Sequence, residues 1–184
     1  MADIVPSIED PIKYHRANVD GTIKVLECAR KANIKRFIYA ASSSCYGLPE
    51  VEPTPENSPA SPMYPYAMTK WVGEKYALHW AQTYKLPVIS LRLFNVFGPR
   101  HRTAGTYGAM FGVFLKQKIK NYPLTVVGDG NQKRDFTYVS DVVAAFAKGL
   151  NYNCKEKILN IGTGKPIKVN TIVTILKSKK IHIP

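Results

Sequence analysis

Cysteine is scarce in this sequence, and long apolar runs are missing from it. The three cysteines, Cys28, Cys45 and Cys154, form no Cys-x-x-Cys pair and have no His-rich spacing, which argues against a disulfide framework and a zinc site. No apolar run approaches the ~18 residues that a membrane span needs. The N-terminus, MADIVPSIEDPIKYH, has no basic-then-apolar signal pattern. We therefore expect reduced thiols, no metal, no membrane partner and a cytoplasmic location.

Acidic residues are also few, 13 against 26 basic ones, and the formal net charge is +13. Such a charge raises nucleic acid as a partner. The basic residues are scattered, however, apart from Lys116–Lys120 and Lys177–Lys180 at expected helix ends, where cations suit the helix dipole. No zinc finger or RNA-recognition motif is present. We expect a solvated surface that suits an anionic small substrate, with nucleic-acid binding as the weakest alternative.

Helix and strand patterns alternate along the chain, without repeats. Helices are expected over residues 12–32, from 65 to about 84, over 109–120, through Lys148 with Ser140 or Asp141 as cap, and through Leu176 with Asn170 as cap. Strands are expected at RFIYAASSS, at PVISLRLFNVFGP as one run ending in Asn95, at LTVVG, at the end of GDGNQKRDFTYV and at KILNIGTG. This alternation predicts βαβ units and a parallel sheet.

Chemistry-bearing residues follow two of the expected strands and open one expected helix. Ser42-Ser43-Ser44 and Phe94-Asn95 close strands and should face one crevice, because ligands bind beyond the carboxyl ends of such strands. Tyr66 and Lys70 are four residues apart and share a helix face. A lysine ammonium within about 4–6 Å would lower the phenol pKa and make Tyr66 a general base. The spacing alone also fits two residues on one helical face.

The ordered series RFIYAASSSCYG, YPYAMTK, LRLFNVFGP, GDGNQKRDFTYVSDV and NIGTG covers nearly the whole chain. It resembles the extended short-chain dehydrogenase/reductase family, and within it the NAD-dependent nucleotide-sugar epimerases and dehydratases. The similarity is greatest to UDP-glucose (or UDP-N-acetylglucosamine) 4-epimerases. The resemblance implies a Rossmann-like α/β fold, NAD as cofactor and a UDP-sugar as substrate.

The resemblance also implies roles for single residues. Tyr66 matches the catalytic tyrosine, Lys70 the lysine that holds the nicotinamide ribose, and Ser42 the catalytic Ser or Thr. The other implied contacts are Phe94 and Asn18 with the cofactor, and Ser43, Ser44, Asn95, Val126, Val127 and Arg134 with the substrate. For each of these a structural role stays open. Asn95 and Arg134 could be loop residues, Phe94 could be core, and Asn18 could only order its helix.

The serine triplet favours one reaction among those of the family. Relatives that dehydrate nucleotide sugars carry Thr-Asp-Glu at this strand end, whereas Ser42-Ser43-Ser44 offers no carboxyl group for elimination. The implied reaction is epimerisation at C4 of a UDP-hexose through a transient 4-keto sugar. The alternatives are another nucleotide-sugar modifier (a UDP-glucuronate epimerase, a dehydratase or a decarboxylase) and a catalytically silent fragment that binds only nucleotide sugars or partners.

The Gly-rich turn with which this family begins, Gly-x-x-Gly-x-x-Gly, is absent. We therefore expect a chain truncated at both ends, lacking the N-terminal βαβ half, and its missing parts would also explain the basic balance. Residues 1–105 are expected to be the C-terminal part of the NAD-binding domain with the catalytic motif. Residues 106–184 are expected to mix a partial substrate-binding region with returning Rossmann elements. Relatives dimerise through helices that correspond here to residues 12–32 and 65–84, so a homodimer stays open.

Overall fold

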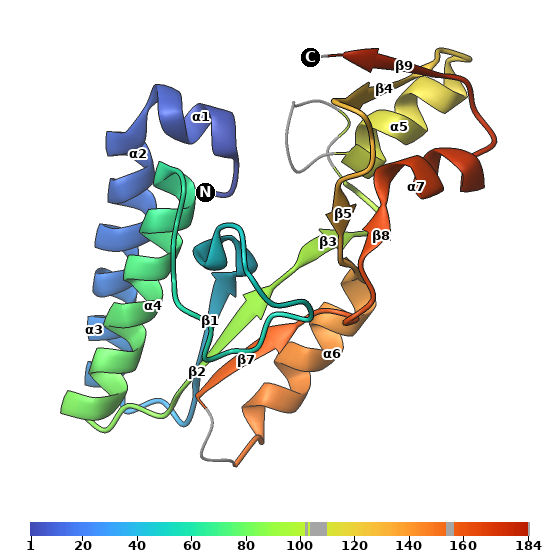
Figure 1. Ribbon diagram of the computed structural model, residues 1–184. Helices are drawn as coiled ribbons and strands as arrows, with labels where there is room; N and C mark the ends of the chain where they lie inside the picture. Colours follow the sequence, from blue (N-terminus) through green and yellow to red (C-terminus); the bar gives the residue numbers. More distant parts are fainter. Residues whose placement is uncertain (102, 104–109, 154–156, 184) are drawn as a thin grey trace. The chain divides into compact units, whose positions relative to one another are not determined.

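The chain folds into two compact units in a computed structural model, which describes residues 1–101, 103, 110–153 and 157–183 (Figure 1). The first unit comprises Met1–Phe94 and Ser140–Ile161, and the second comprises Asn95–Val139 and Gly162–Pro184. The assignment of residues 1–105 and 106–184 to cofactor and substrate roles stays a prediction.

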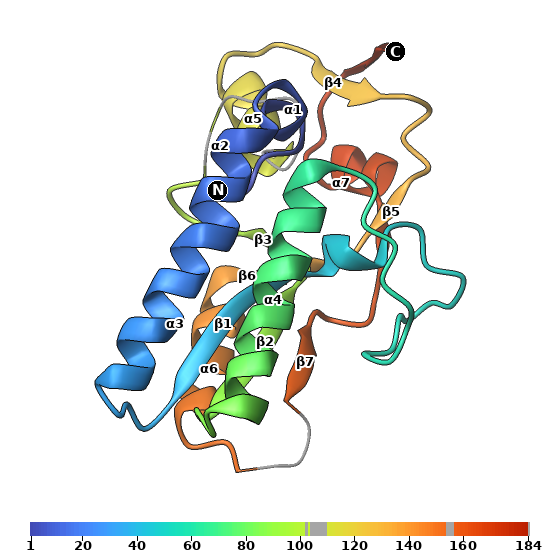
Figure 2. The same ribbon diagram turned by 90° about the vertical axis from the view of Figure 1, so that its left-hand side faces the viewer.

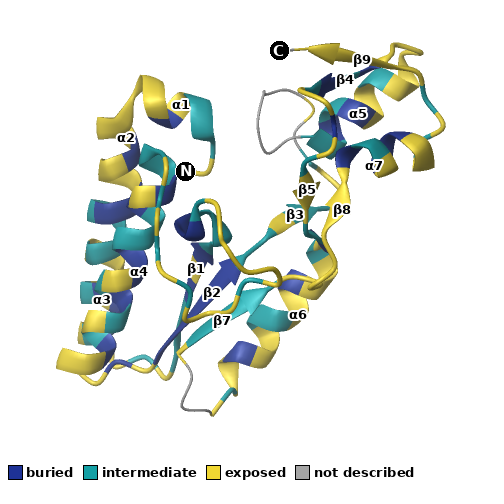
Figure 3. Ribbon diagram, in the orientation of Figure 1, coloured by how far each residue is buried: buried dark blue, intermediate teal, exposed yellow. Residues whose placement is uncertain are grey.

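A parallel sheet forms the centre of the first unit. Its strands are β1 (Phe37–Ser42), β2 (Val88–Leu93) and β7 (Ile158–Ile161), in the order β1-β2-β7. Ser42 is paired with Leu93, and Leu93 with Ile161, so the carboxyl ends of all the strands lie at one edge. The central strand β2 is buried from Val88 to Arg92, as its β-branched and leucine-rich sequence predicts (Figure 3). The expected parallel α/β sheet is confirmed.

Helices cover both faces of this sheet (Figure 2). On one face lie α1 (Ile4–Glu9), α2 (Pro11–His15), a π-helical turn (Arg16–Asp20), α3 (Gly21–Lys31) and α4 (Pro65–Thr83). On the other lies α6 (Val139–Leu150). Small residues of α4, Ala77 and Ala81, let this helix approach the sheet closely, and both belong to the buried core. The helices expected over 12–32 and 65–84 are confirmed, the first with a π-helical turn inside it.

In the second unit, the described residues form short paired strands and two helices. Strand β3 (Asn95–Phe97) is parallel to β6 (Phe136–Tyr138), β4 (Leu124–Val127) is parallel to β9 (Lys180–Ile183), and β5 (Lys133–Arg134) is antiparallel to β8 (Ile167–Lys168). Helices α5 (Met110–Ile119) and α7 (Val169–Ile175) pack on β4. Their shared core consists of Phe114, Leu124, Val126, Val169, Ile172 and Val173.

Three local expectations are wrong. The run PVISLRLFNVFGP is not one strand, because Phe94 N donates to Ile161 O and Asn95 N donates to Asp135 O, so the hydrogen-bonding partner changes between them. Helix α6 begins at Val139, which places Ser140 and Asp141 inside its first turn rather than at the cap. Asn170 lies inside α7, whose N-cap is Lys168; the Asn170 side chain instead donates to Asp129 O.

Two expectations about chemistry can be placed on the described residues. Cys28 and Cys45 are free thiols, and burial raises the pKa of Cys45 to about 11; Cys154 lies outside the described residues. Among the helices that the structure describes, none has the length and apolar character needed to cross a membrane.

Candidate active site

The serines that end β1 form a compact hydroxyl cluster. Ser42 keeps an extended backbone and caps the 3-10 turn Ser43–Tyr46, its Oγ accepting a hydrogen bond from Ser44 N at 3.2 Å. The hydroxyls of Ser42 and Ser44 lie 2.8 Å apart. The turn closes at Gly47, whose φ of 65° and whose contact with Ser61 O leave no room for a Cβ. Two adjacent hydroxyls are thereby fixed at the carboxyl edge of the sheet.

Tyr66 lies in the first turn of α4 and faces this cluster. Pro65 is the first helical residue, where its missing N–H costs nothing. Tyr66 N donates to the Oγ of Ser7 at 3.0 Å, and Ser7 is fully buried in α1. The hydroxyls of Ser42 and Ser44 lie close enough to the Tyr66 phenol to favour its charged form. The structure therefore brings Tyr66, Ser42 and Ser44 together.

The expected lowering of the Tyr66 pKa is wrong. Burial raises the pKa of the Tyr66 phenol, and the hydroxyls of Ser42 and Ser44 offset only part of that rise. The Lys70 ammonium lies over the ring of Tyr39, with Nζ 4.5 Å from the ring centroid. The cost of desolvating a phenolate therefore exceeds the stabilisation that its neighbours supply.

The pKa of Lys70 is itself shifted. Burial lowers the pKa of its ammonium from the ordinary 10.5 to about 8, although the carboxylate of Glu74, one turn further along α4, favours the charged form. A lysine that titrates near pH 8 is charged at neutral pH at a cost in stability. Costly charges of this kind cluster at functional sites.

Replacing Lys70 with Met is expected to stabilise the ligand-free protein below pH 8. A pKa lowered from 10.5 to about 8 corresponds to roughly 3 kcal/mol at about 1.4 kcal/mol per pKa unit, and partial exposure screens some of it, so we expect about 1–3 kcal/mol. Between pH 8 and 10.5 the unfolded chain binds more protons at this residue than the folded one, so wild-type stability rises with pH and the gap closes. Urea unfolding of both proteins at pH 7 and pH 10.5 measures it. A gap that is independent of pH would contradict the prediction.

A buried polar network connects the helix of Tyr66 and Lys70 to the serine turn. Glu74 in α4 receives two hydrogen bonds from Arg92 in β2, Nε to Oε2 at 3.0 Å and Nη2 to Oε1 at 2.6 Å, and a third from Ser90 Oγ at 2.8 Å. Arg92 Nη1 donates to the hydroxyl of Tyr46, which donates to Asn160 Oδ1 in β7. The network fixes α4 against β2 and, through Tyr46, connects both to the turn that carries the serines.

The sequence reasoning missed the residues of this network and Ser7. Arg92 gave a usable signal, because a charged residue within the apolar run VISLRLF needs a buried partner. Glu74 gave another, since it continues the four-residue spacing of Tyr66 and Lys70 on one helix face. Nothing local in the sequence marks Ser7 as the hydrogen-bond acceptor for a backbone 59 residues away.

The remaining candidates are placed as follows. In the first unit, Ser43 lies in the serine turn, Phe94 is half-buried directly after β2, and Asn18 is buried with its Nδ2 donating to Thr69 Oγ1 at 3.0 Å. In the second unit, Asn95 and Arg134 are exposed, Val127 is half-buried and Val126 is fully buried. Asn18 thus serves the packing of α4, since Thr69 Oγ1 in turn donates to Tyr66 O. Contacts of these residues with a cofactor or substrate stay predictions.

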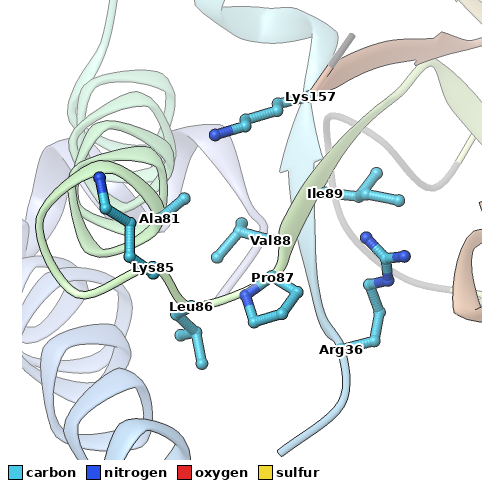
Figure 4. Close-up of a pocket in the computed structure, with 8 residues that line it drawn as sticks. All are labelled: Arg36, Ala81, Lys85, Leu86, Pro87, Val88, Ile89 and Lys157. Carbon is cyan, nitrogen blue, oxygen red and sulfur yellow. The ribbon is translucent and has the colours of Figure 1, made fainter. Parts of the chain in front are cut away.

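A cavity of about 260 Å³ lies at the opposite, amino-terminal edge of the sheet (Figure 4). Its lining includes Arg36 just before β1, Val88 at the start of β2 and Lys157 just before β7. None of the candidate residues lines it. Because ligands of open α/β sheets bind beyond the carboxyl ends of the strands, we place the site at the serine turn and not in this cavity.

Comparisons with known proteins found a matching family model and several similar proteins. Residues 2–162 match the NAD dependent epimerase/dehydratase family. A putative UDP-glucose 4-epimerase of Methanocaldococcus jannaschii is 40% identical over 172 residues, which are 93% of this chain and 55% of that protein. The solved UDP-glucose 4-epimerase of Thermotoga maritima with UDP-glucose has a TM-score of 0.94 and 31% identity, over 100% of this chain and 62% of that one.

A further solved structure shows a relative named for a different sugar. The UDP-glucuronic acid 4-epimerase of Bacillus cereus in complex with NAD has a TM-score of 0.82 and 29% identity, over 90% of this chain and 55% of that one. The chain spans about half the length of the curated relatives that it matches.

Proposed function

Because this chain belongs to the NAD dependent epimerase/dehydratase family, we propose that it inverts C4 of a UDP-hexose through a transient 4-keto sugar, with NAD as cofactor. The observation that carries the proposal is the pair of adjacent hydroxyls, Ser42 and Ser44, near the buried Tyr66 phenol. Two serines beside a buried tyrosine can move a hydroxyl proton. Ser42, Ser43 and Ser44 include no carboxyl group, so this turn supplies no acid–base pair of carboxyls for elimination.

Tyr66 and Ser42 act on the proton of the sugar 4-hydroxyl in this proposal. Ser42 accepts that proton while passing its own to Tyr66, and the same relay returns it at the end of the reaction. Since burial raises the pKa of Tyr66, its phenolate needs neighbouring positive charge, which Lys70, and an oxidised nicotinamide when bound, would supply. When bound, NAD would supply the hydride transfer at C4.

Lys70 fits the role of holding the cofactor. Its ammonium is largely withdrawn from water and lies on the face of Tyr39. A ring face attracts the cation without forming conventional hydrogen bonds, so N–H donors remain for the hydroxyls of a bound ribose. Asn18 and Phe94 are the further proposed cofactor contacts, and Ser43, Asn95, Val126, Val127 and Arg134 the further substrate contacts.

The second candidate is another modifier of nucleotide sugars, favoured by the similarity to a UDP-glucuronic acid 4-epimerase. Dehydration, decarboxylation and a silent nucleotide-sugar binder are the remaining alternatives. A homodimer through residues 12–32 and 65–84 also belongs to the proposal. The exposed apolar side chains of Ile12, Val25 and Met68 on these helices support it. The cytoplasmic location stays a prediction from the sequence.

The test is to incubate the protein together with NAD and one UDP-sugar at a time, and to follow the sugar by proton NMR. The three sugars are UDP-glucose, UDP-N-acetylglucosamine and UDP-glucuronate. We expect C4 inversion of at least one hexose, read from the coupling constants of the ring protons. Inversion of UDP-glucuronate alone would support the second candidate, whereas release of carbon dioxide or loss of water would support a decarboxylase or a dehydratase. Calorimetry with NAD is the companion measurement, and cofactor binding without conversion of any sugar would contradict the proposed activity.

A further inference from the structure

We propose that the Tyr39 ring is the platform that keeps Lys70 charged and aimed into the site, which makes Tyr39 a positioning residue. The inference rests on the proposed function for its consequence, but its geometry stands apart from it. Tyr39 belongs to β1, three positions before Ser42, and its side chain is buried beneath α4 with 6% of its surface exposed. It thus joins the strand of the serines to the helix of Tyr66 and Lys70.

Tyr39 contacts Lys70 at two points. The ammonium Nζ lies 4.5 Å from the ring centroid, within the range of a cation–π contact. The phenol of Tyr39 donates to the backbone oxygen of Lys70 at 3.2 Å. One side chain therefore fixes both the backbone and the charged end of Lys70, and removes most of the freedom of a long, flexible lysine.

The helix is built around this ring. A Cβ at Gly73 would stand 2.2 Å from the Tyr39 hydroxyl and 3.0 Å from Cζ, so only glycine lets α4 settle on it. The hydroxyl also interacts with Thr22 of α3. Burial raises the pKa of Tyr39 to about 12, so the ring stays a neutral phenol wherever Lys70 titrates. The platform is rigid and keeps one charge state.

The other charged and titratable groups near Lys70 do not replace this contact. Glu74 on the same helix favours the ammonium, but both of its carboxylate oxygens already accept hydrogen bonds from Arg92. Tyr66, one turn earlier, stays protonated at neutral pH because burial raises its pKa. The Tyr39 face supplies stabilisation of the cation, and it leaves the N–H groups of Lys70 available.

The experiment varies the electron density of the ring at nearly constant volume. Position 39 is replaced by Phe and then by mono-, di- and trifluorinated phenylalanines. The pKa of Lys70 is measured by NMR of protein with labelled lysine, its signal assigned with Lys70→Met. We expect Tyr39→Phe to hold that pKa within a few tenths. Each added fluorine should lower it, by about 1 pKa unit over the series, a tenfold change in proton affinity.

A substitution by a standard amino acid gives a second measurement. Tyr39→Leu removes the ring, and we expect the same downward direction for the pKa of Lys70. A pKa that stays constant through the fluorinated series, or one that rises in Tyr39→Leu, would overturn the proposal, since burial alone would then set it. These readouts need no turnover. If the pKa of Lys70 fell stepwise in a protein that converts no UDP-sugar, the role of Tyr39 would be supported and the proposed function would be refuted.

The activity readout is the alkaline limb of the pH profile of kcat/KM, because the proposed mechanism needs Lys70 charged and activity should fall as Lys70 loses its proton. In an active protein this limb should move with the measured pKa across the fluorinated series, with Tyr39→Phe as the unfluorinated reference. A ring that served only core packing would change the melting temperature and leave the limb in place, which would also overturn the proposal.

Discussion

Replacing Tyr66 with Phe is expected to lower kcat for sugar epimerisation about a thousandfold, because positioned acid–base groups typically contribute 10²–10⁴ in rate. The change removes only the hydroxyl that lies near Ser42 and Ser44, and the hydrogen bond from Tyr66 N to Ser7 is unaffected. The KM for the UDP-sugar should change little. Steady-state kinetics with the sugar that is converted fastest provide the measurement.

The matched control is Tyr76→Phe, the same chemical change ten residues further along α4, where the ring packs against the core. It should keep wild-type kcat. Both variants should melt as cooperatively as the wild type. If Tyr66→Phe kept a tenth or more of the wild-type kcat, the phenol would not be the proton-transfer group, and the proposed mechanism would be wrong.

Replacing Glu74 with Gln is expected to lower the free energy of unfolding by about 3–5 kcal/mol, the usual cost of breaking a buried ion pair. The side chains of Arg92 and Glu74 are only 4% and 1% exposed, and Arg92 is left with an uncompensated charge. The substitution should also weaken the hydrogen bond that Arg92 donates to Tyr46, and with it the one that Tyr46 donates to Asn160. Equilibrium unfolding in urea at pH 7 measures the change.

Glu27→Gln is the control for this second prediction. Glu27 also pairs with an arginine, Arg30, at 2.9 Å, but on the half-exposed surface of α3. Surface pairs contribute little to stability, so its unfolding midpoint should stay near that of the wild type. Similar losses in both variants would mean that burial does not decide the strength of the Arg92–Glu74 pair.

The sequence predicted more of the fold than of the candidate site. Alternating patterns were enough for the parallel sheet and for the helix of Tyr66, because burial on one face or two leaves a periodic trace. The break at Phe94 left no such trace, since LFNVF stays apolar while the hydrogen-bonding partner passes from Ile161 to Asp135. The predicted helix caps at Ser140 and Asn170 were wrong for a related reason, because tertiary contacts set where each helix begins.

Within the site, the sequence identified which residues matter but not how they act. It brought Tyr66, Lys70 and Ser42 together through the motifs of a family. It could not show that burial raises the pKa of Tyr66, or that Lys70 lies on Tyr39. Both depend on desolvation and on a strand residue that no local pattern connects to α4. Shifted pKa values and cation–π contacts of this kind depend on the three-dimensional arrangement of the side chains.

The chain enters each unit twice, since residues 95–139 of the second unit interrupt the first. During synthesis, β1 and β2 emerge from the ribosome well before β7, so the far side of β2 has no partner until Ile158–Ile161 are made. Arg92 likewise waits for Asn160 to complete its network through Tyr46. The nascent chain therefore passes through a stage with an open strand edge and an unfinished buried charge network, which is when aggregation competes with folding.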